Sequence, residues 1–168
     1  VFTANVGNSL VGQFYNYGLA GDPNRALGSV ANIGATGTMY YGLRIQNDTG
    51  TNVSSVRFQY AGEQWLAFFP VAQTLAFSYQ VSATDITSLT AGTFTPEPAL
   101  NFTTPVTGFV GPLDGNQAAN RAALDQTLIV AIPPGSEIML RWEDAADAAV
   151  LNHGIAIDDV TVSFFIFG

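Results

Sequence analysis

The chain contains neither cysteine nor lysine among its 168 residues. The lack of cysteine excludes a disulfide framework, a thiolate nucleophile and a zinc site built on cysteine, and it leaves the redox compartment open. Charged residues are also scarce, at 11%, whereas apolar residues make up 48%. Thr, Ser, Asn and Gln must therefore fill most solvent-facing positions, as in many β proteins.

The scarce charge is mostly negative, with 13 acidic residues against 5 arginines and a net charge of −8. This balance repels nucleic acid and anionic lipid, so we expect no nucleic-acid partner. No apolar run reaches 18 residues, so we expect no membrane span. No basic segment followed by an apolar one opens the chain, and we expect any signal peptide to have been removed. The acidic balance suits solubility outside the cell, and we expect an extracellular protein.

The length fits one domain over residues 1–168, large enough to bury roughly 70% of the surface of the unfolded chain. Apolar residues alternate with polar ones in many short segments separated by Gly and Pro, and no convincing helix pattern occurs. The pattern predicts an all-β fold, an antiparallel β-sandwich of the jelly-roll kind. The expected main strands cover 38–46, 53–60, 74–81, 126–132 and 137–144, with a closing strand over 154–167.

Two details of strand pairing follow from the pattern. The Asn47–Asn52 turn predicts a hairpin between 38–46 and 53–60, and the segment from Gly62 to Trp65 is expected to end the second strand. In the closing strand the apolar phase shifts by one residue at Asp158 and Asp159. A paired carboxylate at such a shift predicts a β-bulge or a cation-binding end.

Several segments spread over most of the chain carry a resemblance to a known family. They are Asn24-Arg-Ala-Leu-Gly28, Tyr41-Gly-Leu-Arg-Ile-Gln-Asn-Asp-Thr-Gly50, Tyr60-Ala-Gly-Glu-Gln-Trp65, Leu75-Ala-Phe-Ser-Tyr-Gln80, Asp114-Gly-Asn116 with Asn120-Arg121, Ile138-Met-Leu-Arg-Trp-Glu-Asp144 and Asn152-His-Gly-Ile-Ala-Ile-Asp-Asp-Val160. Together they resemble bacterial secreted β-sandwich modules of PEP-CTERM-sorted and multidomain surface proteins. The ending also resembles the closing strand of MAM adhesion domains and of jelly-roll carbohydrate-binding modules. The resemblance implies secretion by a bacterium, outside the cell or at its surface, and a role in adhesion, assembly or glycan binding, often with a structural cation.

Acidic residues cluster around the last two expected strands. Calcium takes six to eight oxygen ligands, and the candidate ligands are Asp144, Asp147, Asp158 and Asp159, with Asp114 and Asn116 from a separate loop. No EF-hand spacing is present. Two interpretations stay open: hydrogen bonding and arginine pairing that fix the loop, which we favour, or a structural calcium ion.

Aromatic residues offer a second candidate site. Trp65 lies at an expected strand end beside Glu63, and with Tyr60 it could form a platform on which a sugar ring stacks. Trp142 is in phase with Ile138 and Leu140 and is predicted to lie in the core. A calcium-assisted carbohydrate-binding module is therefore the alternative function.

The chemistry of an enzyme is weakly represented. His153 is the only histidine, and no Gly-x-Ser-x-Gly motif occurs. We predict a protein that is not an enzyme.

The two ends of the chain carry an assembly hypothesis. An apolar last strand is an edge that must be covered, and strand addition between copies of the chain would cover it. The candidate assembly residues are Val1, Phe2, Phe164, Phe165, Ile166 and Phe167. In this interpretation Val1–Val6 is the donated strand, and the subunits form a filament whose partners are other copies or surface polymers. The alternative is that both ends pair within one sandwich.

Overall fold

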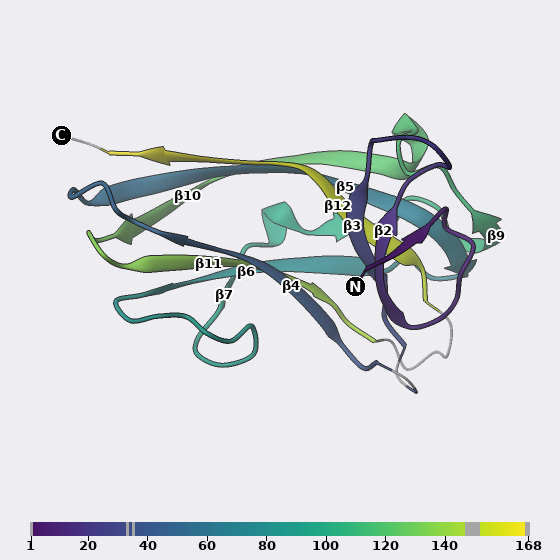
Figure 1. Cartoon of the computed structure of the whole chain (residues 1–168), viewed down its shortest axis with the longest axis horizontal. Coiled ribbons are helices and arrows are strands. Elements are labelled where there is room, and N and C mark those ends of the chain that lie inside the picture. The colour runs from purple at the N-terminus through teal and green to yellow at the C-terminus, as the bar shows by residue number, and fades with distance from the viewer. Residues whose placement is uncertain (1, 33, 35, 147–151, 167–168) are drawn as a thin grey trace.

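The fold is seen in a computed structural model, which describes residues 2–32, 34, 36–146 and 152–166. Two curled β-sheets pack face to face (Figure 1), and this confirms the predicted β-sandwich. No α-helix occurs in these ranges; the two helical turns, η1 (Pro98–Leu100) and η2 (Ala118–Asn120), are 3₁₀ turns. No helix among these residues has the length and apolar character that crossing a membrane requires.

The larger sheet holds seven of the described strands. Its order is β1 (Thr3–Asn5), β2 (Gln13–Tyr17), β3 (Ala26–Val30), β12 (Gly154–Phe165), β5 (Val53–Phe69) and β10 (Arg121–Ile132), with β9 (Gly108–Pro112) pairing the far end of β5. All neighbours are antiparallel except β1 and β2, which are parallel. The sheet is therefore mixed, and a jelly-roll topology is not shown.

The smaller sheet holds five described strands around β11. Its order is β4 (Met39–Gln46), β11 (Glu137–Asp144), β6 (Thr74–Ser82) and β7 (Thr95–Pro96), with β8 (Phe102–Thr103) also pairing β6. All of these pairs are antiparallel.

The predicted hairpin between 38–46 and 53–60 is wrong, because β4 and β5 belong to different sheets. The turn between them crosses from one sheet to the other and is fixed by Asn47. The Nδ2 of Asn47 donates to the carbonyls of Thr51 (2.8 Å) and Ile132 (2.7 Å). Similarly, β11 and β12 flank the acidic segment but lie in different sheets.

β5 is much longer than the sequence predicts and runs through the segment from Gly62 to Trp65. Gly62 does not end the strand; it lets the ring of Phe102 lie against the backbone, since a Cβ there would sit 2.2 Å from Phe102 Cγ. β10 also begins earlier than predicted, at Arg121, and pairs with this extension of β5. The bulge predicted at Asp158 and Asp159 is confirmed by a register shift between Asp158 and Thr161.

The main core lies between the sheets and is rich in rings. Trp142 is buried at its centre, as predicted, with ring centroids of Phe58, Phe77 and Tyr60 at 5.5, 5.5 and 5.6 Å. A second cluster of buried residues surrounds Trp65 and Tyr17. Their rings stack with centroids 5.8 Å apart and planes 4° apart.

Candidate functional site: an open side of the sandwich

One long side of the sandwich lacks a covering strand. β12 pairs with β3 only at Ile155–Ile157, and beyond the bulge Thr161–Phe165 pairs with β5 alone. β4 pairs with β11 alone along its whole length. In the described ranges, therefore, both β4 and the second half of β12 present an unpaired strand edge, and each edge belongs to a different sheet.

Four apolar residues between these two edges face the interior of the sandwich. Leu43 and Ile45 are in register with the core residues Leu140 and Ile138 of β11. Val162 and Phe164 are in register with the core residues Phe58 and Val56 of β5. We call the strip formed by Leu43, Ile45, Val162 and Phe164 the open groove.

The groove residues are exposed although they lie on the inner faces of the sheets. Leu43 is 37% exposed and Phe164 is 38% exposed, whereas the core residues beside them are almost fully buried. Ile45 and Val162 are half-buried against the main core. An inner-face side chain stays this exposed only where the next strand is missing.

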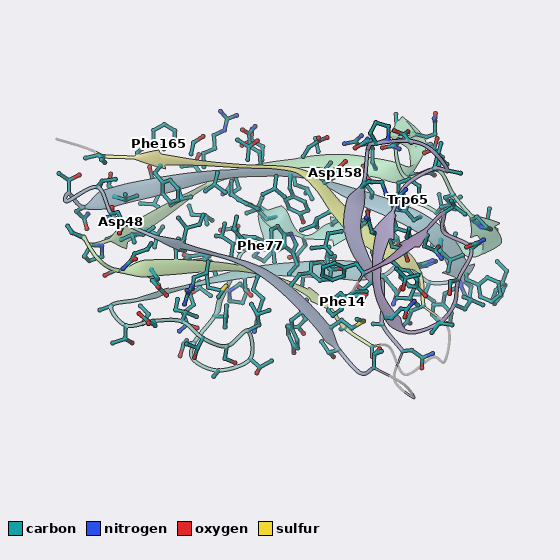
Figure 2. All side chains as sticks on the ribbon, viewed as in Figure 1. Phe14, Asp48, Trp65, Phe77, Asp158 and Phe165 are labelled. Atoms are coloured by element: carbon teal, nitrogen blue, oxygen red, sulfur yellow. The ribbon has the colours of Figure 1, made fainter. Side chains whose placement is uncertain are left out.

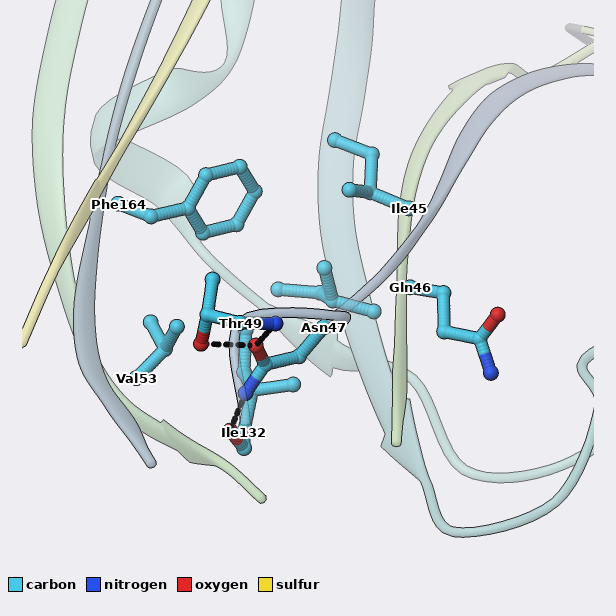
Figure 3. A pocket seen from close by; sticks show the side chains of 8 residues that line it. Ile45, Gln46, Asn47, Thr49, Val53, Ile132 and Phe164 are labelled. Atoms are coloured by element: carbon cyan, nitrogen blue, oxygen red, sulfur yellow. Dashed lines mark hydrogen bonds between the residues drawn. The ribbon is translucent and has the colours of Figure 1, made fainter. Parts of the chain in front are cut away.

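Figure 3 shows the end of the groove as a small pocket. Phe164 from β12 and Ile45 from β4 face each other across it, and a cavity of about 60 Å³ is lined also by Val53, Ile132 and Ile138. Its polar wall is Asn47, whose Oδ1 accepts from Thr49 Oγ1 at 2.7 Å. The lining contains no charged side chain.

The other half of the same side is covered by the chain's own first strands. The ring of Phe14 on β2 contacts Tyr41 of β4 edge-on, with centroids 5.7 Å apart. Phe2 in turn packs edge-on against Phe14 at 6.0 Å. The cover ends there, since the positions that follow Tyr41 on the inner face of β4 are Leu43 and Ile45.

The bulge in β12 marks the boundary between the covered and the open half (Figure 2). Asp159 adopts a left-handed conformation with φ of 52°. Its carboxylate accepts from Arg121 at 2.8 Å, and Arg121 also lies 3.6 Å from the buried carboxylate of Glu63. The ion pairs fix the point at which β12 loses β3 as its neighbour.

The predicted carbohydrate platform is not formed by its candidate residues. Trp65 is only 1% exposed, and Glu63 and Tyr60 are also buried. Trp65, which the alternative interpretation needs at the surface, is buried because the chain folds over it: a Cβ on Gly115 would lie 2.3 Å from the indole nitrogen, and one on Gly7 would lie 1.9 Å from the Trp65 carbonyl oxygen. Tyr60 instead donates from its hydroxyl to the carbonyl of Leu100 at 2.5 Å.

Glu63 is held inside the fold by its neighbours. Trp65 Nε1 donates to its Oε2 at 2.9 Å. Burial raises the pKa of Glu63 to about 7; the indole hydrogen bond and Arg121 lower it, and the nearby Asp158 raises it. The Glu63 side chain is fully buried.

The predicted calcium ligands do not converge. Asp144 is buried and accepts from Ser29 Oγ at 2.5 Å, while Asp158 and Asp159 lie at the bulge beside Arg121. Asp114 closes its own loop by accepting from the Asn116 backbone at 3.1 Å, and Asn116 accepts from Asn24 at 2.7 Å. Asp147 lies outside the described residues. Over the placed part of the chain no three acidic or histidine side chains are grouped to hold a metal ion.

His153 is buried in a hydrogen-bonded setting rather than in a reactive one. Its Nε2 lies 3.0 Å from the Val71 carbonyl, and its Nδ1 lies 3.1 Å from Gln64 and 3.3 Å from the backbone nitrogen of Phe68. Burial lowers its pKa. Both ring nitrogens thus have structural partners.

The candidate assembly residues lie in two places. Phe164 lines the open groove, and Phe165 and Ile166 follow it with 43% and 49% exposure (Figure 2). Phe2 lies beside β1 and is 57% exposed. Val1 and Phe167 are outside the described residues. Both ends of the described chain pair with strands of the same chain, β1 with β2 and β12 with β5.

Sequence reasoning missed the half of the groove that β4 contributes. Leu43 and Ile45 belong to a strand that was predicted correctly, and their alternation gave the right face. The alternation did not show that this face is left partly uncovered, because that depends on how far β3 extends along β12.

Comparison of the chain with family models, with curated proteins and with solved structures found no match.

Proposed function

We propose that this protein is a non-enzymatic assembly subunit, acting outside the cell or at a bacterial cell surface, whose copies join by strand addition at the open groove. One observation carries the proposal: Leu43 and Phe164 point into the sandwich yet are more than a third exposed, between two unpaired strand edges. A strand laid beside β12 would satisfy its free backbone groups and bury these side chains together.

Backbone pairing favours a strand as the occupant. An unpaired edge is a template for another strand, and proteins that stay monomeric protect such edges with lysine, proline, inward charges or a β-bulge. The bulge of β12 lies before this stretch; residues 162–165 themselves carry no proline and no charge, and the chain contains no lysine. Val160, which precedes Thr161 and lies within the bulge, is 40% exposed. Burial of the four groove side chains would contribute on the order of 25 cal/mol per Å² of apolar surface removed from water.

The direct test compares two neighbouring phenylalanines by electron microscopy of concentrated protein. Phe164 faces the groove, and Phe165 has similar exposure but faces away from the core on the same strand. We expect the native chain and Phe165→Ser to form filaments and Phe164→Ser to remain dispersed. Thermal unfolding of both variants verifies that they fold.

Two results would overturn the proposal. A native chain that stays monomeric at high concentration, with rapid solvent exchange of the amides in 161–165, would show that the edge needs no partner. Equal loss of filaments in Phe164→Ser and Phe165→Ser would indicate association through the outer face of the larger sheet, without strand addition.

A further inference from the structure

We infer that the strand received by the open groove is residues 2–6 of a second copy of this chain, donated head to tail. The inference rests on the proposed function and names the donor. The donor segment leaves β2 of its own subunit and pairs along residues 161–165 of β12 in the neighbour.

The donor segment is weakly held in its own subunit. β1 has only three residues, pairs in parallel with β2 and has no neighbour on its other side within the described ranges. Thr3 and Ala4 are exposed, and Phe2 is 57% exposed. Short parallel pairing at an edge is among the least stable kinds of strand pairing. Moving this segment therefore exposes little surface that is now buried.

The segment has a natural pivot at its end. Asn5 Oδ1 accepts from the backbone nitrogens of Gly7 (2.7 Å) and Asn8 (3.0 Å), and Gly7 has φ of 81°. Gly7 is fixed against the Trp65 backbone, where no side chain would fit. Residues before this turn can swing out while residues after it stay packed.

The pattern of the segment matches the groove. Phe2, Ala4 and Val6 alternate with Thr3 and Asn5, which is the pattern of a strand with one buried face. The five residues 2–6 span about 17 Å at about 3.3 Å per residue, and antiparallel pairing that sets Ala4 opposite Val162 also sets Phe2 opposite Phe164, so that the apolar face of the donor points into the groove. Residues 1–21 carry no charge, and neither do the four groove residues. No charge would be buried by this pairing.

The first strands of the chain cover part of the same side of the sandwich. Phe2 and Phe14 already form an aromatic cover over Tyr41 on the adjacent part of β4. When residues 2–6 leave, Phe14 stays over Tyr41, and the apolar strand received from a second copy would cover the rest of this side at Leu43 and Ile45.

The segment cannot reach the far part of its own groove. Gly7 is fixed at Trp65, which lies seven residues beyond Phe58 on β5, about 23 Å along the strand. Phe58 pairs with Val162, and Val56 with Phe164 one step further. The five Cα–Cα steps from Phe2 to Gly7 span only about 17 Å when extended. A neighbouring copy has no such tether, so the occupant is a second subunit.

Donor and acceptor surfaces lie apart along the molecule. In Figure 1 β2 and β3 lie toward one end of the long axis, and the second half of β12 runs from there toward the other end. An interface between two different surfaces is heterologous, and repeated without closure it gives a filament.

A disulfide experiment tests the inference, since the native chain has no cysteine. Ala4→Cys and Val162→Cys are made as separate proteins, mixed, allowed to assemble and oxidised. We expect a covalent heterodimer at least tenfold in excess of that from Thr3→Cys mixed with Val162→Cys, because Thr3 lies on the opposite face of the donor. Each variant oxidised alone controls for accidental pairing.

The possible outcomes test the donor assignment and the proposed function separately. Filaments without excess Ala4–Val162 crosslinking would overturn the donor assignment and leave strand addition standing with another segment. The donor assignment would also be overturned if the double variant Ala4→Cys, Val162→Cys formed its disulfide only within one chain. Absence of filaments under all conditions would overturn the proposed function itself.

Discussion

Ser29 of β3 donates a hydrogen bond to Asp144 of β11 across the interior of the sandwich, 2.5 Å from Oγ to Oδ2. The two residues belong to different sheets, and Tyr41 completes the contact with its hydroxyl 2.9 Å from Ser29 Oγ. A buried polar bridge of this kind fixes the position of one sheet on the other at the covered end of the groove. It also places a carboxyl group where ionisation is costly.

The first prediction concerns pH. Burial raises the pKa of Asp144 to about 7, whereas an unfolded aspartate titrates near 4. The folded state therefore binds more protons between these values, and its stability falls as pH rises from about 4 to about 7. Asp144→Asn should reduce this fall, by on the order of 2–4 kcal/mol, in urea unfolding measured at both pH values.

Two other groups shape the same curve. Glu63, with its pKa raised to about 7, adds a fall of the same sign, and the lowered pKa of His153 gives the opposite sign below its ordinary value. The difference between native chain and variant isolates Asp144. An unchanged slope in the variant would contradict the burial argument.

The second prediction concerns the indole of Trp65. Its hydrogen bond lowers the pKa of Glu63 against the larger opposing effect of burial. Trp65→Phe removes the donor, so the pKa of Glu63 should rise further above 7, as measured by the carboxyl carbon shift in NMR titration. The pKa of Asp144 serves as the internal control, and a fall in the Glu63 value would contradict the prediction.

The third prediction separates two reasons why a position requires glycine: a left-handed backbone conformation and a lack of space for a Cβ atom. Gly7 and Gly21 have φ of 81° and 78°, but only Gly7 is enclosed; a Cβ at Gly21 would meet nothing within 4 Å. Gly21→Ala should cost about 1–2 kcal/mol from the left-handed backbone alone. Gly7→Ala should cost at least about 2 kcal/mol more, because its Cβ meets backbone. Equal losses in thermal unfolding would show that Gly7 is not fixed against Trp65.

The fourth prediction concerns the turn that carries the chain between sheets. Asn47 donates to the carbonyls of Thr51 and Ile132 and is buried. Asn47→Ala leaves these groups without their donor and should destabilise the fold by about 2–3 kcal/mol. Asp48→Ala, at the exposed neighbour, should change stability by less than about 0.5 kcal/mol. A loss at Asn47 no larger than that at Asp48 would contradict the assigned role.

The sequence by itself determined the local structure. Alternation of apolar residues placed β4, β6 and β11 within a residue of their ends, and the phase shift at Asp158 and Asp159 located the bulge. It also placed Trp142 in the core. These features depend on side chains a few residues apart along one strand, and a period-two pattern records them directly.

Only the tertiary structure decided which strands are neighbours and which side chains are covered. Sequence could not show that β4 and β5 separate into two sheets, that loops at Gly7 and Gly115 bury Trp65, or that β3 ends beside Ile157. Exposure of an inner-face residue depends on whether a strand distant in sequence lies next to it. Leu43 has the pattern of a core residue in its own strand, and the fold alone leaves it at an open edge opposite Phe164.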